Sequence, residues 1–345
     1  MKQDNTKPTI DKVAKLCNVS KTTISRYLNG KYEFMSEETK TRIENVIKEL
    51  DYRPSNIART LKLNKSKLIG VLIADISSPF SSILVKGIGD VCKENGYMVI
   101  IANTDNDPDK EKDYIESLID NRVEGLIINT TGKINDFINE KGKQGLSIVL
   151  ADRGSKELKF DTITTNNYEM TFKTIKHLIK KGFKKIAFFT QDVGSISSRY
   201  IRKNAFLDAF KEQLGIDASD MVYVIDLNDK EMVDTSILDF VNKYKKQNKA
   251  LFTVNGVTML NVLQGVSRLK LKIPEDIGVC GYDDWGWASL IPPGITVINQ
   301  PSYQVGVESA KCLINRMNDT ENSKKPAKFI ELPAELDERG STLIK

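Results

Sequence analysis

Six polar side chains in a short N-terminal segment have the chemistry needed to contact DNA. The segment VSKTTISRYLNG, residues 19–30, has few apolar positions and is rich in hydroxyls and cations. If a helix begins after Ser20, all six except Thr23 project from one face, at i, i+1, i+4, i+5 and i+8. Such a face fits a major groove, because its cations can contact phosphates and guanine, and its hydroxyls can contact phosphates or bases. A solvated helix surface is the alternative. The six residues are Lys21, Thr22, Thr23, Ser25, Arg26 and Asn29.

The charge distribution along the chain agrees with a polyanion as the partner of this segment. Residues 1–67 hold 15 Lys and Arg against 8 Asp and Glu, whereas the remaining residues hold 36 against 38. A small basic head on a near-neutral body predicts contact with nucleic acid. A generally solvated basic surface is the alternative, and charge alone does not separate the two.

Three short helices are predicted to position the polar face. They lie near residues 9–17, 20–30 and 36–50, with Ser20 and Ser36 as N-caps and Gly30 just past the second helix. The residues CNVS between the first two helices match the corner of a helix-turn-helix. We therefore predict an all-α helix-turn-helix head over residues 1–54. Residues 55–67 have barely two helical turns and little to pack on, which predicts a linker that orders on contact.

The pattern of apolar and polar residues changes at Leu68. Nine apolar runs alternate with amphipathic segments, which predicts parallel sheets covered by helices on both faces. We expect an α/β body over residues 68–335 with two doubly wound lobes, one of residues 68–164 and 296–322, the other of residues 165–295 and 323–335. A cleft for a polar small molecule should lie where the strands end. The polar residues at those ends are Asp75, Asn103, Asn129, Asp152, Asn255, Asp283 and Gln300.

The sequence argues against an enzyme, a cofactor site or a metal site. The segment GIGDVC, residues 87–92, lacks the third glycine of a dinucleotide fingerprint, and no phosphate-binding GxxxxGK[ST] occurs. The single histidine, His177, has no evident Ser or Cys partner, and no cluster has metal-ligand spacing. Four scattered cysteines without a CxxC pair indicate reduced thiols in the cytosol.

Three segments resemble the lactose/purine repressor family of bacterial transcription regulators. They are TIDKVAKLCNVSKTTISRYLNG, DYRPSNIARTL and IGVCGYDD with the following IPPGITVINQP, and the resemblance continues to LPAELDERGST near the end of the chain. It implies that the second helix reads bases and that the linker becomes a hinge helix when two subunits bind a palindromic operator. It also implies two lobes like those of periplasmic sugar-binding proteins.

The resemblance extends the predicted DNA contacts beyond the second helix. Leu61 matches the leucine that wedges into the minor groove, with Ala58 beside it, and such a wedge kinks the duplex. Without the resemblance, Leu61 reads equally as an ordinary core residue. The further contacts expected on this basis are Thr9, Tyr52, Arg53 and Asn56.

The resemblance also assigns residues to an effector pocket in the body. Asp152, Arg202, Asn255 and Asp283 match effector-contacting positions, and Asp and Asn hold sugar hydroxyls whereas Arg binds a carboxylate through two hydrogen bonds. Phe80 and Trp285 are candidates for stacking on an effector, although Trp285 and Trp287 fit equally as packing residues. The full predicted set is Phe80, Asn129, Asp152, Arg153, Arg199, Arg202, Asn255, Asp283, Trp285 and Gln300.

Two departures from the family pattern bear on the effector. Ala205 stands before Phe206 where glycine is usual, and Gly256 stands where an acidic residue is common. The pocket thus loses an anionic candidate while Arg153, Arg199 and Arg202 lie near its expected wall, which favours a carboxylate or phosphate. The segments LVKGIGDVC and DDWGWASLIPPGITVINQPSYQVG further resemble regulators of 2-keto-3-deoxygluconate and hexuronate catabolism. We expect a sugar acid as effector, with a neutral sugar as the alternative.

These observations together predict a cytoplasmic, DNA-binding repressor that a small effector controls allosterically. No run of about 18 apolar residues indicates a membrane span, and the first residues have no apolar signal core. The ending GSTLIK has no leucine heptad, which favours a homodimer over a tetramer. A sugar-binding transport component and a sugar-modifying enzyme with a DNA-binding head are the competing interpretations.

Overall fold

The chain consists of two compact units, which are described separately. The computed structural model describes residues 8–52, 65–155, 157, 159–318 and 325–343. The units comprise residues 1–66 and 67–345. Four predicted DNA contacts, Arg53, Asn56, Ala58 and Leu61, lie outside the described residues, as does most of the predicted hinge helix.

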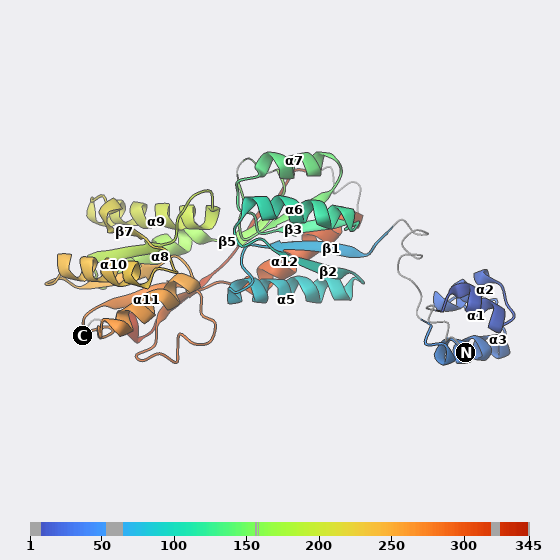
Figure 1. Ribbon diagram of the computed structural model, residues 1–345. Coiled ribbons are helices and arrows are strands. Elements are labelled where there is room, and N and C mark those ends of the chain that lie inside the picture. The colour runs from blue at the N-terminus through green and yellow to red at the C-terminus, as the bar shows by residue number, and fades with distance from the viewer. Residues whose placement is uncertain (1–7, 53–64, 156, 158, 319–324, 344–345) are drawn as a thin grey trace. The chain divides into compact units, whose positions relative to one another are not determined.

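The first unit, called the head below, has three helices: α1 (Ile10–Leu16), α2 (Lys21–Leu28) and α3 (Glu37–Glu49) (Figure 1). The predicted caps are confirmed, because Ser20 accepts a hydrogen bond from the N–H of Thr23 and Ser36 accepts one from the N–H of Thr39. Gly30, at φ +70°, follows α2 in the left-handed conformation that favours glycine. The core of the head is formed by Val13, Ala14, Cys17, Ile24, Ile43 and Tyr52.

The second unit, called the body below, contains two six-stranded sheets, which confirms the predicted fold class. The first sheet has the order β11-β5-β4-β3-β1-β2, and the second has the order β12-β10-β9-β8-β6-β7. All neighbouring strands are parallel except β12, which pairs antiparallel with β10. The strands of the first sheet are β1 (Leu68–Ile73), β2 (Met98–Asn103), β3 (Gly125–Ile128), β4 (Ser147–Ala151), β5 (Asp161–Thr165) and β11 (Phe329–Leu332). Those of the second are β6 (Lys185–Thr190), β7 (Val222–Val224), β8 (Lys249–Thr253), β9 (Gly278–Tyr282), β10 (Thr296–Asn299) and β12 (Glu335–Asp337).

Helices cover both faces of the first sheet, which forms lobe one. One face packs against α5 (Pro79–Glu94) and α12 (Ser302–Asn318), and the other packs against α6 (Pro108–Asp120) and α7 (Asn135–Lys143). Four helices pack against the second sheet in lobe two: α8 (Asn167–Lys180), α9 (Ser197–Leu214), α10 (Lys230–Lys243) and α11 (Gly256–Arg268) (Figure 1). Two short 3-10 turns, Ser219–Met221 and Gly340–Thr342, complete this lobe.

The predicted lobe boundaries are wrong at two segments. Residues 296–299 were expected in lobe one, but β10 pairs with β9 in the second sheet. Residues 329–332 were expected in lobe two, but β11 pairs with β5 in the first sheet. The chain therefore crosses between the lobes three times, after β5, after β10 and after β11. The three crossings place the ends of strands from both sheets around one cleft.

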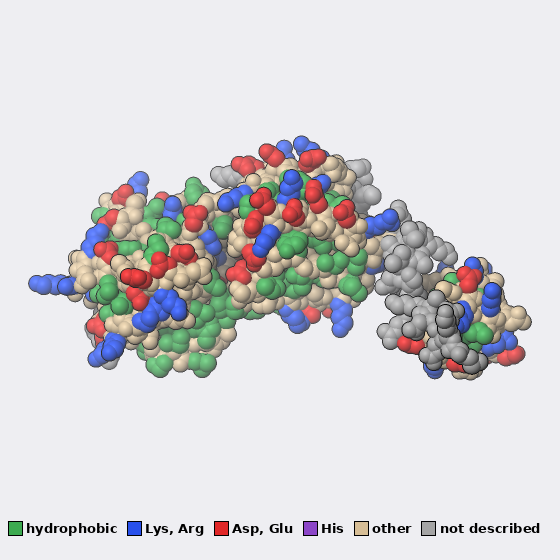
Figure 2. All heavy atoms as spheres, in the orientation of Figure 1, with side chains coloured by type: hydrophobic (Ala, Val, Ile, Leu, Met, Phe, Trp, Pro, Cys, Tyr) green, Lys and Arg blue, Asp and Glu red, His purple; other side chains and the backbone are tan. Residues whose placement is uncertain are grey.

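The surface of the body matches its near-neutral charge. On the face shown in Figure 2, side chains of Lys and Arg are interspersed with those of Asp and Glu over both lobes. Among the helices that the structure describes, none combines the length and the apolar character that a bilayer crossing needs.

Candidate functional site

The predicted polar face of α2 is exposed on the head. Ile24 is fully buried and anchors the helix to the head core. Lys21, Thr22, Arg26 and Asn29 are exposed, whereas Thr23 and Ser25 are half-buried. Because α2 has one buried anchor and an opposite polar side, it can present its side chains to a groove without disturbing its own packing.

Local contacts orient several side chains of this face. The ammonium group of Lys21 lies 2.5 Å from a carboxylate oxygen of Asp11 in α1. The guanidinium of Arg26 lies 5.5 Å from the ring centroid of Phe34, a largely exposed aromatic residue. The amide of Asn29 donates to the carbonyl of Ser25 over 2.7 Å. These contacts restrain the polar side chains while leaving them at the surface.

Two predicted DNA contacts have different positions in the head. Thr9 is exposed and its hydroxyl accepts a hydrogen bond from the N–H of Lys12, so it caps α1. Tyr52 is only 8% exposed and packs in the head core, where burial raises the pKa of its hydroxyl. Tyr52 therefore packs in the head core, and its contact with DNA stays a prediction.

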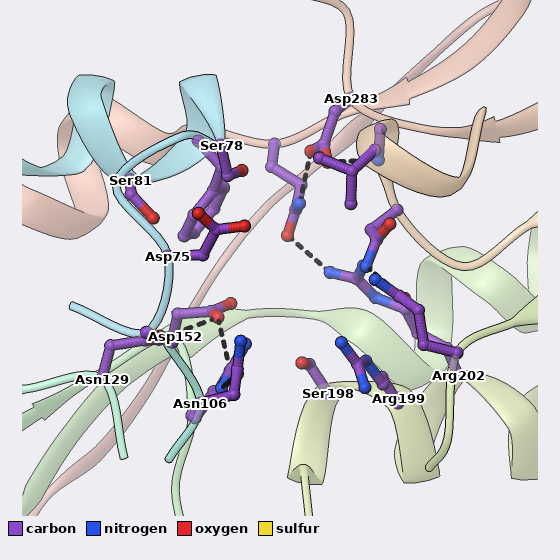
Figure 3. Close-up of a pocket in the computed structure, with 18 residues that line it drawn as sticks. Asp75, Ser78, Ser81, Asn106, Asn129, Asp152, Ser198, Arg199, Arg202 and Asp283 are labelled. Carbon is purple, nitrogen blue, oxygen red and sulfur yellow. Dashed lines mark hydrogen bonds and ion pairs between the residues drawn. The ribbon is translucent and has the colours of Figure 1, made fainter. Parts of the chain in front are cut away.

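A polar pocket lies in the body between the two lobes. Figure 3 shows Asn129 and Asp152 on one side and Ser198, Arg199 and Arg202 of α9 on another. Its lining follows from the topology, because the carboxyl ends of parallel strands and the beginnings of the following helices meet at one edge of each sheet. The lining residues of lobe one are Ala74, Asp75, Ser78, Phe80, Ser81, Asn106, Asn129, Asp152 and Arg153. Those of lobe two and its crossing are Gln191, Ser198, Arg199, Arg202, Asn255, Gly256, Val257, Asp283 and Gln300.

The structure brings together all the predicted effector residues except Trp285. The ring of Trp285 lies 2.4 Å from where a Cβ on residue 256 would stand, and it lines a neighbouring hollow with Pro301 and Tyr303. Gly256, which departs from the family pattern, thus makes room for Trp285. Asn103 also lies apart from the pocket lining, since its amide donates to Asp105 and its oxygen accepts from the N–H of Ile76.

Several lining residues were not predicted. Asp75 had been recognised at a strand end without being assigned to the site, and Gln191 follows β6 in the same way. Ser78, Ser81 and Ser198 lie at the beginnings of α5 and α9, a position that follows a strand and could have identified them. No sequence pattern identified Asn106 as a lining residue, because it lies in the loop after β2, where its φ is +57°.

One wall of the pocket is a buried network around Arg202, which is 3% exposed. Its Nε donates to Asn167 over 2.8 Å, its Nη1 to the carbonyl of Val254 over 2.6 Å and its Nη2 to Gln300 over 2.7 Å. Its guanidinium also stacks on the ring of Tyr282 at 3.5 Å. Every nitrogen of Arg202 therefore donates to a protein acceptor.

Asp283 joins this network through Gln300. Its carboxylate accepts from the amide of Gln300 over 2.6 Å and from the N–H of Gly256 over 2.9 Å. Burial raises the pKa of Asp283, whereas the charge of Arg202 and these hydrogen bonds act in the opposite direction. Arg202 and Asp283 together form a buried frame at the back of the pocket.

Other lining residues, in both lobes, have polar groups with spare capacity. Asp152 accepts from the amide of Asn129 over 3.1 Å, and the Nη1 of Arg153 donates to Asn106 over 2.8 Å. The Nε of Arg153 is buried, has no hydrogen-bond partner among the described residues, and lies 3.9 Å from a carboxylate oxygen of Asp152. The Nη1 of Arg199 donates to the carbonyl of Asp192 over 2.6 Å. Burial and then the nearby charge of Arg153 lower the pKa of Arg199 to about 10.

Direct hydrogen bonds join the two lobes beside the pocket. The hydroxyl of Ser195 donates to the carbonyl of Thr131 over 2.6 Å, and the N–H of Gly154 donates to the hydroxyl of Ser197 over 3.1 Å. These contacts hold the lobes together at the edge of the cleft. Within the part of the chain that the structure describes, no group of His, Cys, Asp and Glu is arranged to hold a metal ion.

Comparisons with known proteins match both units. Residues 9–55 match the model of bacterial regulatory proteins of the lacI family, and residues 175–342 match a periplasmic binding protein-like domain. The transcriptional regulator KdgR of Bacillus subtilis is 38% identical over 333 residues, which cover 96% of this chain and 97% of that protein. The transcriptional regulator PtxS of Pseudomonas aeruginosa is 33% identical over 334 residues, which cover 97% of this chain and 95% of that protein.

A solved structure agrees with the observed fold. The lac repressor dimer bound to operator and the anti-inducer ONPF superposes with a TM-score of 0.85 at 23% identity. That comparison covers 98% of this chain and 100% of the other chain. The similarity extends through both units of the chain.

Proposed function

Because the chain belongs to the lacI family of bacterial regulatory proteins, and is thus a DNA-binding transcriptional regulator, we propose that it is a cytoplasmic repressor. In this proposal two subunits bind a palindromic operator, and a sugar acid in the pocket controls the binding. The relatives that cover nearly the whole chain are transcriptional regulators rather than enzymes.

The exposed face of α2 carries the DNA-binding half of the proposal. Lys21, Thr22, Arg26 and Asn29 are exposed on a helix whose other side is anchored by Ile24. A helix of this kind enters a major groove with its first residues toward base edges, and dimers place two such helices on half-sites of a palindrome. The lac repressor, which shares the fold, was solved as a dimer on its operator, and this supports the same arrangement here.

The chemistry of the pocket supports a sugar acid, with 2-keto-3-deoxygluconate as the favoured effector. Asp75 and Asp152 offer carboxylate oxygens to hydroxyl groups, and Arg153 and Arg199 offer N–H donors to a carboxylate. The pocket thus presents both kinds of partner that a hydroxylated acid needs. The resemblance of two segments to regulators of 2-keto-3-deoxygluconate catabolism supports the same choice.

The proposed control is a shift between two arrangements of the lobes. An effector that contacts both lobes favours the arrangement in which Ser195 reaches Thr131 and Ser197 reaches Gly154. A change in lobe angle would alter the spacing of the two heads of a dimer. A coupling free energy of about 1–3 kcal/mol changes operator affinity roughly 5- to 150-fold.

Fluorescence anisotropy of a labelled palindrome from the protein's own promoter tests this function. We expect specific binding at fixed salt, and at least a tenfold change in affinity when 2-keto-3-deoxygluconate is added. Binding without any response would remove this sugar acid as the effector and leave the regulator intact. Equal affinity for the palindrome and for a scrambled duplex would contradict operator recognition.

A further inference from the structure

The three arginines of the pocket differ in the donors that they leave for a ligand. All three nitrogens of Arg202 donate to Asn167, Val254 and Gln300, so this residue has little capacity for a further acceptor. Arg153 and Arg199 each donate to the protein only through Nη1, among the residues that the structure describes. A guanidinium has five N–H groups, so both keep donors that a ligand can use.

Arg153 and Arg199 belong to different lobes. Arg153 follows β4 in lobe one, with its side chain 13% exposed, and Arg199 lies in the first turn of α9 in lobe two. Both line the same pocket. Their charges interact, since Arg153 contributes to the lowered pKa of Arg199. Without a ligand, this like-charge pair opposes the approach of the two lobes.

We propose that the carboxylate of the effector binds between Arg153 of lobe one and Arg199 of lobe two, and that this bridge favours the closed arrangement of the lobes. The inference rests on the proposed function, in which the effector is a sugar acid. Arg202 is assigned a different task, because it positions Gln300, Asn167 and Asp283 at the back of the pocket.

The surroundings of the two arginines favour an anion at this point. The helices α5 and α9 both begin at the pocket, and neither has a side-chain N-cap hydrogen bond. The positive ends of these helix dipoles therefore add to the charge of the arginines. The buried Nε of Arg153 has no hydrogen-bond partner, and a buried donor without a partner costs free energy that a carboxylate would recover.

The charge of Asp192 acts to raise the pKa of Arg199, and the other acidic groups near the pair have other partners or other geometry. Glu111 accepts from the N–H and the hydroxyl of Thr131, and Asp283 accepts from Gln300 and Gly256. Asp152 lies 3.9 Å from the Nε of Arg153, which is too long for a hydrogen bond, and Asp75 accepts from Ser77. The remaining oxygens of Asp75 and Asp152 suit hydroxyl groups of the effector. A sugar acid then provides an acceptor for the arginine N–H groups and hydroxyl donors for the aspartate carboxylates, whereas a neutral sugar provides partners only for the carboxylates.

Two probes that differ at one carbon test the bridge. The first is 2-keto-3-deoxygluconate, and the second is 3-deoxyfructose, in which a CH₂OH group replaces the carboxylate. Binding of both by titration calorimetry is compared for the full-length protein and for the variants Arg153→Gln and Arg199→Gln. Arg122→Gln, an exposed arginine of lobe one outside the pocket lining, is the matched control for loss of one charge.

We expect each pocket variant to weaken binding of the acid by about tenfold to a hundredfold, the value of a charge-assisted hydrogen bond. Binding of 3-deoxyfructose should change by less than about threefold, because no ion pair is lost with that probe. Arg122→Gln should leave the affinity for both probes unchanged. Arg202→Gln should weaken both probes alike and lower the melting temperature of the body, as expected for a positioning residue.

Closure is measured separately by hydrogen–deuterium exchange of the segment that contains Gly154. Its N–H bonds to Ser197 of the other lobe, so closure should slow its exchange. The acid should protect this segment in the unmodified protein, and 3-deoxyfructose should protect it less. Acid binding within threefold of the unmodified protein in both pocket variants would refute the bridge and leave the proposed function standing. If the unmodified protein binds neither probe, the sugar-acid effector itself is wrong.

Discussion

The polar face of α2 and the pocket of the body are built in opposite ways. The face belongs to one helix of 8 residues, and it needs only the small head core behind Ile24. The pocket takes its lining from the ends of strands in two sheets, and Gln300 reaches it only because the chain crosses between the lobes. A local site of this kind is encoded in consecutive residues, whereas the pocket depends on the complete topology.

The difference also separates the two sites physically. The head and the body are distinct compact units, so a core defect in one should leave the other folded. Both tryptophans, Trp285 and Trp287, belong to the body. Tryptophan fluorescence therefore reports unfolding of the body without a contribution from the head.

The largest expected effect comes from Ile24→Ala, which removes the anchor of the polar face. Ile24 is fully buried, and such a truncation costs about 2–5 kcal/mol, which is most of the stability of a small domain. Operator affinity should fall at least about a hundredfold, while the tryptophan unfolding transition stays unchanged. Operator affinity within threefold of the unmodified protein would contradict the role of Ile24.

The converse experiment uses a substitution that destabilises the body around the pocket and leaves the head folded. Arg202→Gln leaves the buried Asp283 without its nearby cation and disrupts the bonds to Asn167 and Val254. Breaking a buried charged network costs about 3–5 kcal/mol. The urea midpoint of the tryptophan transition should drop accordingly. The circular dichroism of a separately expressed head, residues 1–66, is the reference signal for the unit that the variant does not affect. An unchanged urea midpoint of the tryptophan transition would show that the network adds no stability to the body.

A third variant acts on the contact between the lobes. Gly132 has φ +75°, and a Cβ there would lie 2.6 Å from the carbonyl oxygen of Ser195 in the other lobe. Gly145→Ala is the matched control, because Gly145 also has positive φ, at +97°, but no atom lies within 4 Å of its would-be Cβ. Backbone strain of about 1–3 kcal/mol is common to both variants.

Only Gly132→Ala should oppose closure in addition to that strain. We expect it to weaken effector binding about tenfold more than Gly145→Ala does, since binding then has to work against the clash. Titration calorimetry with 2-keto-3-deoxygluconate measures the ratio. Equal effector affinities in the two variants would mean that the closed contact does not take part in binding.

The smallest expected effect concerns a single cation of the polar face. Lys21→Ala should weaken operator and non-specific DNA alike, because we expect the ammonium group of Lys21 to contact a phosphate, whereas the other exposed residues of the face reach base edges. The slope of log affinity against log salt should fall by about one. Anisotropy titrations at several salt concentrations measure it. A loss confined to the operator would instead make Lys21 a base-reading residue.

The features predictable from sequence were those with local signals. Ser20 and Ser36 were recognised as caps from their position before helical segments, and nine strands were recognised from apolar runs. Three strands were missed, because β5 has the sequence DTITT, and β11 and β12 are short and contain acidic residues. The burial of β5 comes from the helix and strands packed around it, so its polar composition hid it. The missed strand β11 explains one of the wrong lobe boundaries, whereas β10 was recognised as a strand but expected in the wrong sheet.

The pocket shows the same limit at the level of single residues. Arg153 and Arg199 lie in its lining as predicted, because they stand close in sequence to Asp152 and Arg202, which match effector-contacting positions of the family. Trp285 and Asn106 could not be placed, since their positions depend on a missing Cβ at Gly256 and on a loop with positive φ. Which arginine has free donors likewise depends on contacts between distant segments, such as Arg202 with Gln300.

The proposed control requires that the pocket and the polar face are energetically linked, and linkage must be reciprocal. The most direct test is the affinity for 2-keto-3-deoxygluconate, measured by calorimetry with and without saturating operator DNA. We expect operator to change this affinity by at least about tenfold, by the same factor and in the same direction as the effector changes operator affinity. An unchanged sugar-acid affinity in the presence of bound operator would show that the pocket and the polar face are not linked.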